Sequence, residues 1–255
     1  MVVFIKKIIF SFHILRKKMI SSANIYMSSG KNCTNYLQCY GVKKNKIIEY
    51  PFSSVNYTKK ELKTLSENEV ANLKNKEGLN KIVLLTVGQY IHRKGIDILL
   101  EAYKDLNCND ISLLIIGNGP LKNTYLEYIK NYNLRNVIIK DFLKKDDLIK
   151  YYKISDIFIL PTRFDVWGLV INEAMNFSLP IITTNRCGSA TDLVKEGYNG
   201  YIFNVDDVED LKNKLEFLIN NMELRNKFSI NSNKMICKYN VKNMATKYLD
   251  AINLL

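Results

Sequence analysis

The pattern of hydrophobic and polar positions becomes regular near residue 81. From there, the continuous apolar runs "KIVLLTVG" (81–88) and "ISLLIIG" (111–117) show no polar alternation, which is typical of parallel strands buried on both faces. Between them, "IDILLEAYKDL" (96–106) places its apolar residues at helical spacing. The pattern therefore predicts a strand, a helix and a second strand, and it continues in this way toward the C-terminus.

The remaining apolar runs extend this alternation. Further strands are predicted at 136–140, 156–161, 179–184 and 200–203, and further helices at 121–132, 145–155, 168–177, 190–197 and 207–221. About six alternations of strand and helix indicate an α/β fold with a doubly wound parallel sheet. Ligands of such sheets bind beyond the carboxyl ends of the strands, where the strand order reverses. The loops at that edge are therefore the candidate site.

The part before residue 81 is less regular. A helix at 1–20, a strand at 23–29, a helix at 32–42 and a strand at 46–52 form a short βαβ unit. We expect this unit to be residues 1–52, followed by a polar, lysine-rich linker at 53–80, the doubly wound domain at 81–235 and a C-terminal helix at 236–255. A length of 255 residues suits one domain and part of another.

Composition adds a strong positive charge. The chain has 37 Lys and Arg against 25 Asp and Glu, a net charge of +12. This charge is explained either by lysines spread over solvated helix faces or by attraction to anions such as nucleotide phosphates or a membrane surface. The basic residues show no regular interleaving with aromatic ones, so nucleic acid is disfavoured as a partner.

The cysteines and the N-terminus concern the cell compartment. The five cysteines are scattered and form no CxxC pair or Cys/His cluster, which favours reduced thiols in a cytoplasmic protein and predicts no metal site. The apolar start is interrupted by Lys6-Lys7 and Arg16-Lys17-Lys18, which disfavours a signal peptide or a spanning helix. Its alternatives are an ordinary packed helix and a basic amphipathic helix on the inner face of the membrane.

The first candidate site is the loop "GQYIHRKG" (88–95). Gly88 lets the backbone approach a ligand closely, and Arg93 and Lys94 follow within reach of the same point. Two cations beside a cleft suit a diphosphate, whereas a basic surface turn is the ordinary alternative. We interpret His92 as a loop residue without a catalytic role.

The second candidate is "GNGP" (117–120), which follows the next buried strand. Gly117 and Gly119 would allow backbone contact with a ligand. The sequence does not continue as Gly-x-Gly-x-x-Gly, and no acid stands at the usual distance for a ribose. An NAD-dependent enzyme is therefore disfavoured.

The third candidate is "DVWGLVINEAM" (165–175). Gly168, Leu169 and Val170 would supply amides at a helix N-terminus, which suits an anion. Glu173, one turn further, would face the same cleft and accept from ribose hydroxyls, with a salt bridge to a lysine as its ordinary alternative. Asp165 would meet a sugar on the other side, with helix N-capping as its alternative. The spacing predicts a nucleotide-sugar ligand.

These motifs together resemble the donor-binding half of a family 4 (group 1) glycosyltransferase with the B-type fold. "VGQYIHRKGIDILLEAY", "LLIIGNGPL", "DVWGLVINEAM" and "CGSATDLVKEGYNGYIF" occur in the order of that family, across about residues 81–225. The resemblance implies retaining transfer of a sugar from a nucleoside diphosphate to an acceptor hydroxyl, without a cofactor. The usual setting is polysaccharide or glycolipid biosynthesis.

The resemblance also implies roles for residues. Lys94 and Arg93 would contact the diphosphate, the amides of 168–170 would hold it, and Glu173 would bind the ribose. Asp165 would be the catalytic-site acid that meets the transferred sugar. Phe142 and its neighbours would lie near the base.

The sequence departs from the family at three of these places. Gln89 replaces a common arginine, Asp141 replaces a common glycine, and Asp165 replaces a glutamate.

The resemblance further implies that residues 1–52 are the remnant of an acceptor domain. The Gly-rich first loop and the histidine of that domain are absent, which predicts a truncated or split enzyme whose transfer activity needs an acceptor-domain chain. The alternatives are a non-catalytic nucleotide-sugar-binding module and a B-type nucleotide-sugar epimerase.

Overall fold

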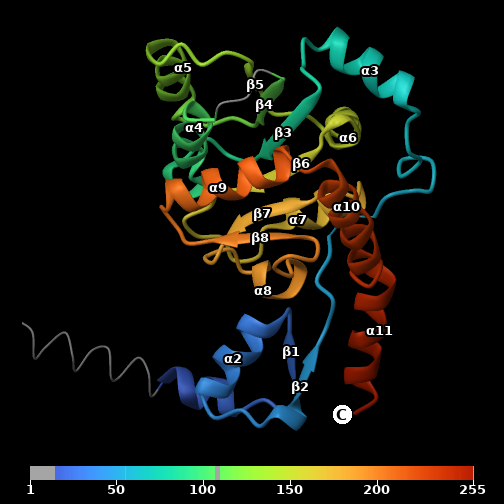
Figure 1. Cartoon of the computed structure of the whole chain (residues 1–255). Helices are drawn as coiled ribbons and strands as arrows, with labels where there is room; N and C mark the ends of the chain where they lie inside the picture. The colour runs from blue at the N-terminus through green and yellow to red at the C-terminus, as the bar shows by residue number, and fades with distance from the viewer. Residues whose placement is uncertain (1–14, 55, 107–109, 255) are drawn as a thin grey trace, which may run out of the picture. The chain divides into compact units, whose positions relative to one another are not determined.

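The computed structural model in Figure 1 describes residues 15–54, 56–106 and 110–254. Its contacts divide the chain into two compact units, one made of Met1–Ser54 with Lys238–Leu255 and the other of Val55–Cys237. Most of the helix predicted at 1–20 lies outside the described residues, while residues 15–21 are helical. Each unit is described separately below.

The first unit contains a two-stranded parallel sheet. Strand β1 (Tyr26–Ser28) pairs with β2 (Ile47–Glu49), and helix α2 (Lys31–Cys39) and the short 3₁₀ helix η1 (Lys44–Lys46) connect them. Helix α11 (Val241–Ile252) contacts β2. The predicted strand, helix and strand are therefore present, and the C-terminal helix begins at Val241 rather than at 236.

The charge of the described part of this unit is strongly positive. Its acidic residues are Glu49 and Asp250, whereas its basic residues are Arg16, Lys17, Lys18, Lys31, Lys43, Lys44, Lys46, Lys238, Lys242 and Lys247. Much of the excess positive charge of the chain is thus carried by its smaller unit.

The second unit is built on a six-stranded parallel sheet with the order β5-β4-β3-β6-β7-β8. The strands are β3 (Ile82–Val87), β4 (Ile111–Ile116), β5 (Val137–Lys140), β6 (Ile157–Leu160), β7 (Ile181–Thr184) and β8 (Gly200–Phe203). β3 and β4 align from Ile82 with Ile111 to Val87 with Ile116. Every residue of β4 is buried, as its sequence predicted, and every residue of β6 and β7 is buried as well, including the polar Thr183 and Thr184. The predicted doubly wound α/β fold is confirmed.

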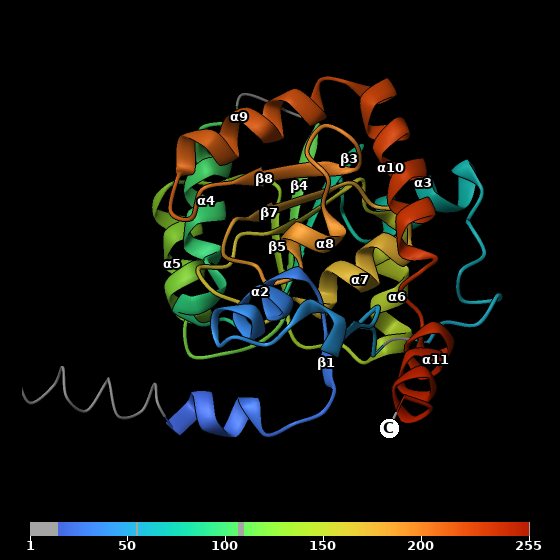
Figure 2. The same ribbon diagram turned by 90° about the horizontal axis from the view of Figure 1, so that it is seen from below.

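Helices cover both faces of this sheet (Figure 2). They are α3 (Glu67–Lys76), α4 (Ile96–Lys104), α5 (Lys122–Asn131), α6 (Lys145–Ile154), α7 (Leu169–Asn176), α8 (Ala190–Leu193), α9 (Val208–Ile219) and α10 (Met222–Ile236). Buried side chains of α4, α5 and α9 form one core with strand residues such as Leu84 and Leu113. Helices α6 and α7 pack against the strands from the other side, and α3 contacts α6.

The sequence pattern did not predict α10 as a separate helix. Its buried side includes the polar residues Asn231 and Ser232, while the apolar Ile230 is exposed. Asn231 donates to the carbonyl of Tyr198, so tertiary contacts rather than an apolar stripe fix this helix. In the part of the chain that the structure describes, no helix has both the length and the apolar character needed to cross a membrane.

The strand order reverses between β3 and β6, the two central strands. Strands β3, β4 and β5 follow one another toward one edge of the sheet. The chain then crosses to the other side of β3, where β6, β7 and β8 follow one another toward the opposite edge. The loops after β3 and β6 therefore leave neighbouring strands and lead in opposite directions. This arrangement is where open α/β sheets bind ligands.

Candidate functional site

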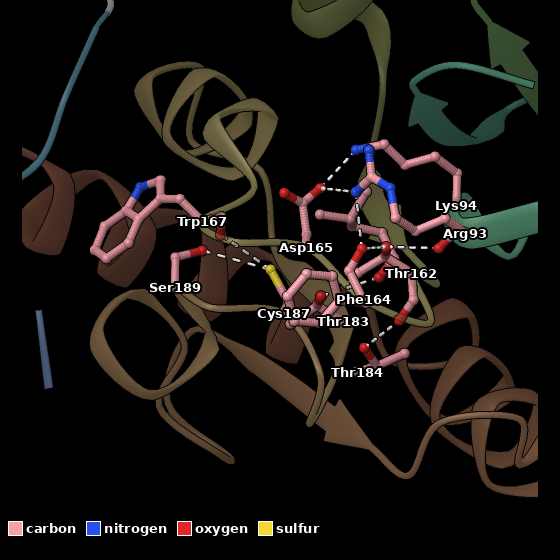
Figure 3. Close-up of polar contacts among 11 residues, drawn as sticks. Arg93, Lys94, Thr162, Phe164, Asp165, Trp167, Thr183, Thr184, Cys187 and Ser189 are labelled. Carbon is pink, nitrogen blue, oxygen red and sulfur yellow. Dashed lines mark hydrogen bonds and ion pairs between the residues drawn. The ribbon is translucent and has the colours of Figure 1, made fainter. Parts of the chain in front are cut away.

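The loops after β3 and β6 bring together the predicted cations and acid. Lys94 lies at the end of the 3₁₀ helix η2 (His92–Lys94), and its Nζ donates to Asp165 Oδ2 at 2.5 Å. Arg93 Nη1 lies 3.8 Å from the same oxygen. Figure 3 shows both cations pointing toward Asp165. The Lys94 and Asp165 side chains are each only 14% exposed, so this ion pair is largely screened from water. N-capping, the ordinary alternative for Asp165, is not observed, because Gly168 occupies the N-cap of α7 without a side-chain bond.

Backbone and hydroxyl contacts hold these two loops side by side. Thr162 Oγ1 donates to the carbonyl of Arg93 at 2.9 Å, and the Arg163 amide donates to the same carbonyl at 2.8 Å. Thr184, at the end of β7, donates from Oγ1 to the carbonyl of Thr162 at 2.6 Å. The positions of Arg93 and Lys94 are therefore set by the loop that carries Asp165 (Figure 3).

Arg163 completes this support. Its guanidinium binds both carboxylate oxygens of Asp97 in α4, at 2.9 and 2.7 Å, and donates to Asp206 at 2.7 Å. It also donates to the carbonyl of His92 at 2.8 Å. A bidentate pair of this kind fixes geometry, and the Arg163 guanidinium holds the pKa of the Asp97 carboxyl below its ordinary value despite burial. His92 is a loop residue whose carbonyl serves this network.

The N-terminus of α7 is shaped by a close contact with the next loop. Gly168 has φ +87°, and a Cβ there would lie 2.8 Å from Cys187 Sγ. Cys187 is 1% exposed, and its thiol contacts the carbonyl of Trp167 at 3.1 Å and Ser189 Oγ at 3.6 Å (Figure 3). Glycine is therefore required at 168, and α7 begins at Leu169, four residues after Asp165. The first amides of a helix have no acceptor within it, so those of Leu169 and Val170 can serve a ligand.

Gly117 and Gly119 are required first by packing. A Cβ on Gly117 would lie 1.8 Å from the carbonyl oxygen of Gly88, and one on Gly119 would lie 2.6 Å from that of Tyr90. The amide of Tyr90 donates to the carbonyl of Asn118 at 2.8 Å. The loops after β3 and β4 therefore continue to pair beyond the ends of their strands.

A cavity of about 410 Å³ opens beside these loops. Five of the predicted site residues line it together with six others: Val87, Gly88, Gln89, Ile116, Gly117, Asn118, Phe142, Leu143, Leu148, Val170 and Glu173. Phe142 is 73% exposed and stands at its edge. Its walls combine apolar side chains with a few polar groups, which is the composition of small-molecule sites.

Glu173 is the acid of this cavity. Tyr152 Oη, from α6, donates to its Oε2 at 2.8 Å. Burial raises the pKa of the Glu173 carboxyl above its ordinary value of 4.5, although the Tyr152 hydroxyl and the charge of Lys145 oppose that rise. The predicted alternative, a salt bridge to lysine, is not found for Glu173 among the described residues. An acid that is desolvated but faces a cavity is suited to accept hydrogen bonds from a ligand.

The structure therefore places the predicted residues in two adjoining groups. Gly88, Gly117, Phe142, Val170 and Glu173 line the cavity, and Arg93 and Lys94 meet Asp165 at the loop crossing. Gly88 joins the two groups, because a Cβ on it would touch the Lys94 side chain at 3.7 Å. Gly119 supports the loop without lining the cavity.

Two contacts that support the candidate site were not predicted from the sequence. Tyr152 and Arg163 carried no signal, because each acts on a partner that is distant in the chain, Glu173 and Asp97 respectively. Asp141, a departure noted in the sequence, forms an exposed ion pair with Lys122 at 2.5 Å.

Chemically, the candidate site offers cations, helix amides and two carboxylates at the carboxyl edge of the sheet. The cations and amides suit an anionic group. The carboxylates suit hydroxyl groups on its two sides, and the cavity suits a flat apolar group. The fold is a doubly wound α/β domain, and its candidate site lies at the reversal of the strand order, where open α/β sheets bind ligands.

Comparison with known proteins identifies this domain. Residues 69–235 match the family described as glycosyl transferases group 1. The chain is 31% identical over 182 residues to an uncharacterized glycosyltransferase, MJ1178, of Methanocaldococcus jannaschii, which covers 66% of this chain and 51% of that protein. It is also 31% identical over 201 residues to the capsular polysaccharide biosynthesis glycosyltransferase CapM of Staphylococcus aureus, covering 76% of this chain and 51% of CapM.

Solved structures agree on the fold. A glycosyltransferase from Rickettsia africae superposes with a TM-score of 0.79 at 19% identity, covering 94% of this chain and 65% of that one. HepE from Anabaena, in complex with UDP and glucose, superposes with a TM-score of 0.75 at 17% identity, covering 91% and 64%.

The chain belongs to the glycosyl transferases group 1 family. It spans about half the length of the curated relatives that it matches.

Proposed function

We propose that this chain binds a nucleoside-diphosphate sugar and serves in the retaining transfer of a hexosyl group to an acceptor hydroxyl. The observation that carries this proposal is the adjoining placement of the Glu173 cavity and the Lys94–Asp165 pair at the reversal of the strand order. A base, a ribose, a diphosphate and a sugar follow one another in such a ligand. We match these four parts to the apolar cavity wall, Glu173, the cations Arg93 and Lys94, and Asp165, in that order.

Each part of the donor is assigned to particular residues. The base lies between Phe142 and the apolar cavity wall, and the ribose hydroxyls donate to Glu173. The diphosphate lies at Gly88, Arg93 and Lys94 and accepts from the amides at 168–170. The transferred sugar lies beside Asp165. HepE was solved with UDP-glucose, which supports a donor of this class.

The chemistry follows from charge. The diphosphate gains negative charge as its bond to the sugar breaks, and cations and fixed amides stabilise a charge that develops at their position. Lys94 is bonded to Asp165, so the acid that meets the sugar is anchored to the cation that meets the leaving group. The bond between Lys94 and Asp165 fixes both side chains before the reaction begins, so less entropy is lost when they are oriented toward the substrate.

The site described above has no assigned role in binding the acceptor. Since the chain spans about half of its relatives, we propose that it supplies the donor half and that an acceptor-binding region, on a longer or a separate chain, completes the enzyme. Relatives named for capsular polysaccharide and amylovoran biosynthesis support a role in polysaccharide or glycolipid synthesis.

We place this activity in the cytoplasm, with peripheral contact at the inner face of the membrane. The basic excess of the first unit supports this contact, because anionic lipid attracts clustered Lys and Arg. Co-sedimentation with vesicles that contain anionic lipid should exceed that with zwitterionic vesicles, and equal sedimentation would contradict the contact.

Isothermal titration tests the donor assignment. UDP, GDP and their glucose and mannose conjugates are titrated into the chain, and one nucleoside diphosphate is expected to bind at micromolar to millimolar concentration. Glu173→Gln should weaken that binding about ten- to a hundredfold, because hydrogen bonds to a charged acceptor are lost. Absence of binding by every nucleotide would overturn the proposal. Sugar transfer by this chain alone would contradict the proposal that an acceptor-binding region outside it is needed.

A further inference from the structure

Tyr152 is fixed more firmly than its place in a surface helix requires. It is 1% exposed, and its ring is stacked on Phe177 with centroids 5.4 Å apart and planes 3° apart. A second ring, Phe158 of β6, lies 6.1 Å away. The hydroxyl of Tyr152 is therefore held at one point, and at that point it donates to Glu173 Oε2 at 2.8 Å.

This contact leaves the rest of the Glu173 carboxylate for the cavity. No other hydrogen bond to the Glu173 carboxylate occurs among residues 15–54, 56–106 and 110–254. An ionised carboxylate has about four acceptor positions. Tyr152 occupies one on Oε2, so each oxygen still has capacity to accept from a ligand.

Two further side chains, Tyr57 and Lys145, support the stacked rings of Tyr152 and Phe177. Tyr57 packs edge-on against Phe177 at 4.9 Å, and Lys145 Nζ lies 4.6 Å from the centre of the Tyr57 ring. Lys145 also donates to the carbonyl of Asn56 at 3.0 Å and to Glu61 at 2.7 Å. The segment 56–61 is thereby attached to the start of α6.

We propose that Tyr152 is a positioning residue that orients the Glu173 carboxylate toward two adjacent hydroxyls and so makes the site selective for ribonucleotides over 2′-deoxyribonucleotides. This inference rests on the proposed function. The terminal torsion of a glutamate is broad, so without its anchor the carboxylate turns freely. A turning carboxylate still accepts from one hydroxyl but loses the advantage of meeting two at once.

The same contact makes a prediction about pH. The titratable or charged groups that face Glu173 are Tyr152 and Lys145 of α6 and Tyr57 of segment 56–61. Burial raises the pKa of Glu173, and the Tyr152 hydrogen bond lowers it. Tyr152→Phe removes the lowering contact, so the pKa of Glu173 rises further. Nucleotide binding needs the ionised carboxylate, and its loss on acidification should therefore begin at a higher pH in the variant.

The chain offers a closely matched control. Tyr151, the preceding residue, is also buried and donates to a glutamate, Glu77 Oε2, at 2.9 Å. Glu77 does not line the cavity. Tyr151→Phe therefore removes the same kind of hydrogen bond from the same helix without touching Glu173.

The experiment uses the nucleoside diphosphate that the chain binds and its 2′-deoxy counterpart. Affinities are measured by titration across a pH series for the wild-type chain, Tyr152→Phe and Tyr151→Phe, with thermal unfolding to verify the fold. The wild type should prefer the ribonucleotide about tenfold or more. Tyr152→Phe should reduce that preference at least about threefold and move the acidic loss of binding upward, whereas Tyr151→Phe should do neither.

The outcomes separate this inference from the function on which it rests. If the wild type binds no nucleoside diphosphate, the proposed function fails. If it prefers the ribonucleotide and Tyr152→Phe retains both the preference and the pH profile, the function stands and the role of Tyr152 is overturned. Should Tyr152→Phe fail to fold, Phe177→Leu provides the second variant. It removes the ring that is stacked on Tyr152 while the hydroxyl remains, so it should also reduce the preference for the ribonucleotide, and an unchanged preference would overturn the role of Tyr152.

Discussion

Lys94 connects the two halves of the candidate site. Its aliphatic stem lies against Gly88, and its ammonium group is bonded to Asp165. Sequence alone identified both partners, because Lys94 and Asp165 each follow a predicted strand at the same edge of the sheet. It could not show that they pair, since nothing in the spacing of two loops 71 positions apart fixes a side-chain contact.

Lys94→Met should weaken binding of the nucleoside diphosphate about ten- to a hundredfold, because a charge-assisted contact with phosphate is lost while the stem remains. Titration calorimetry provides the measurement. Lys104→Met is the control, since Lys104 pairs with Glu101 on the outer side of α4. Affinity of the Lys94 variant within twofold of the wild type would exclude Lys94 from the diphosphate site.

At the scale of elements, the strands were the most predictable part. The apolar runs located all six strands of the larger sheet, because strands covered on both faces are rich in apolar residues, even where a hydroxyl side chain such as Ser112 is buried among them. Helix α10 and the 3₁₀ turn η2 escaped prediction. The buried face of α10 is partly polar, and η2 is held by carbonyl contacts with the loop that carries Thr162 and Arg163.

Pairing of the loops after β3 and β4 gives a test at this scale. Gly117→Ala would place a Cβ 1.8 Å from the Gly88 carbonyl, whereas Gly197→Ala meets no atom within 4 Å. Both glycines have positive φ, so both variants carry backbone strain, which costs about 1–2 kcal/mol. Gly117→Ala should lose about 1–3 kcal/mol more than Gly197→Ala because the clash adds to the strain. Urea unfolding followed by circular dichroism measures the difference, and equal losses would show that the loops can separate freely.

At the scale of the molecule, the two units divide charge and candidate chemistry between them. Every predicted site residue belongs to the second unit, while the described first unit carries mostly basic residues. A ligand that binds only the native second unit stabilises it by mass action, by about 2.7 kcal/mol at a concentration 100 times Kd.

Hydrogen exchange with and without the nucleoside diphosphate checks this division. Added nucleotide should slow exchange at 88–95, 117–119 and 168–173 and leave β1, β2 and α11 unchanged. The reason is that the proposed ligand contacts lie only in the second unit. Protection that is equal in both units would show that the nucleotide acts on the whole chain.

Continued pairing of the β3 and β4 loops has a consequence for the way in which a ligand binds. Main-chain hydrogen bonds already join Gly88 to Ile116 and Tyr90 to Asn118, and a further bond joins Gly117 to Lys140. Loops joined in this way are preorganised, so the proposed nucleotide should bind them with little loss of conformational entropy. Association should then be limited by diffusion and orientation rather than by loop ordering, and differences in affinity among nucleotides should appear mainly as differences in their dissociation rates.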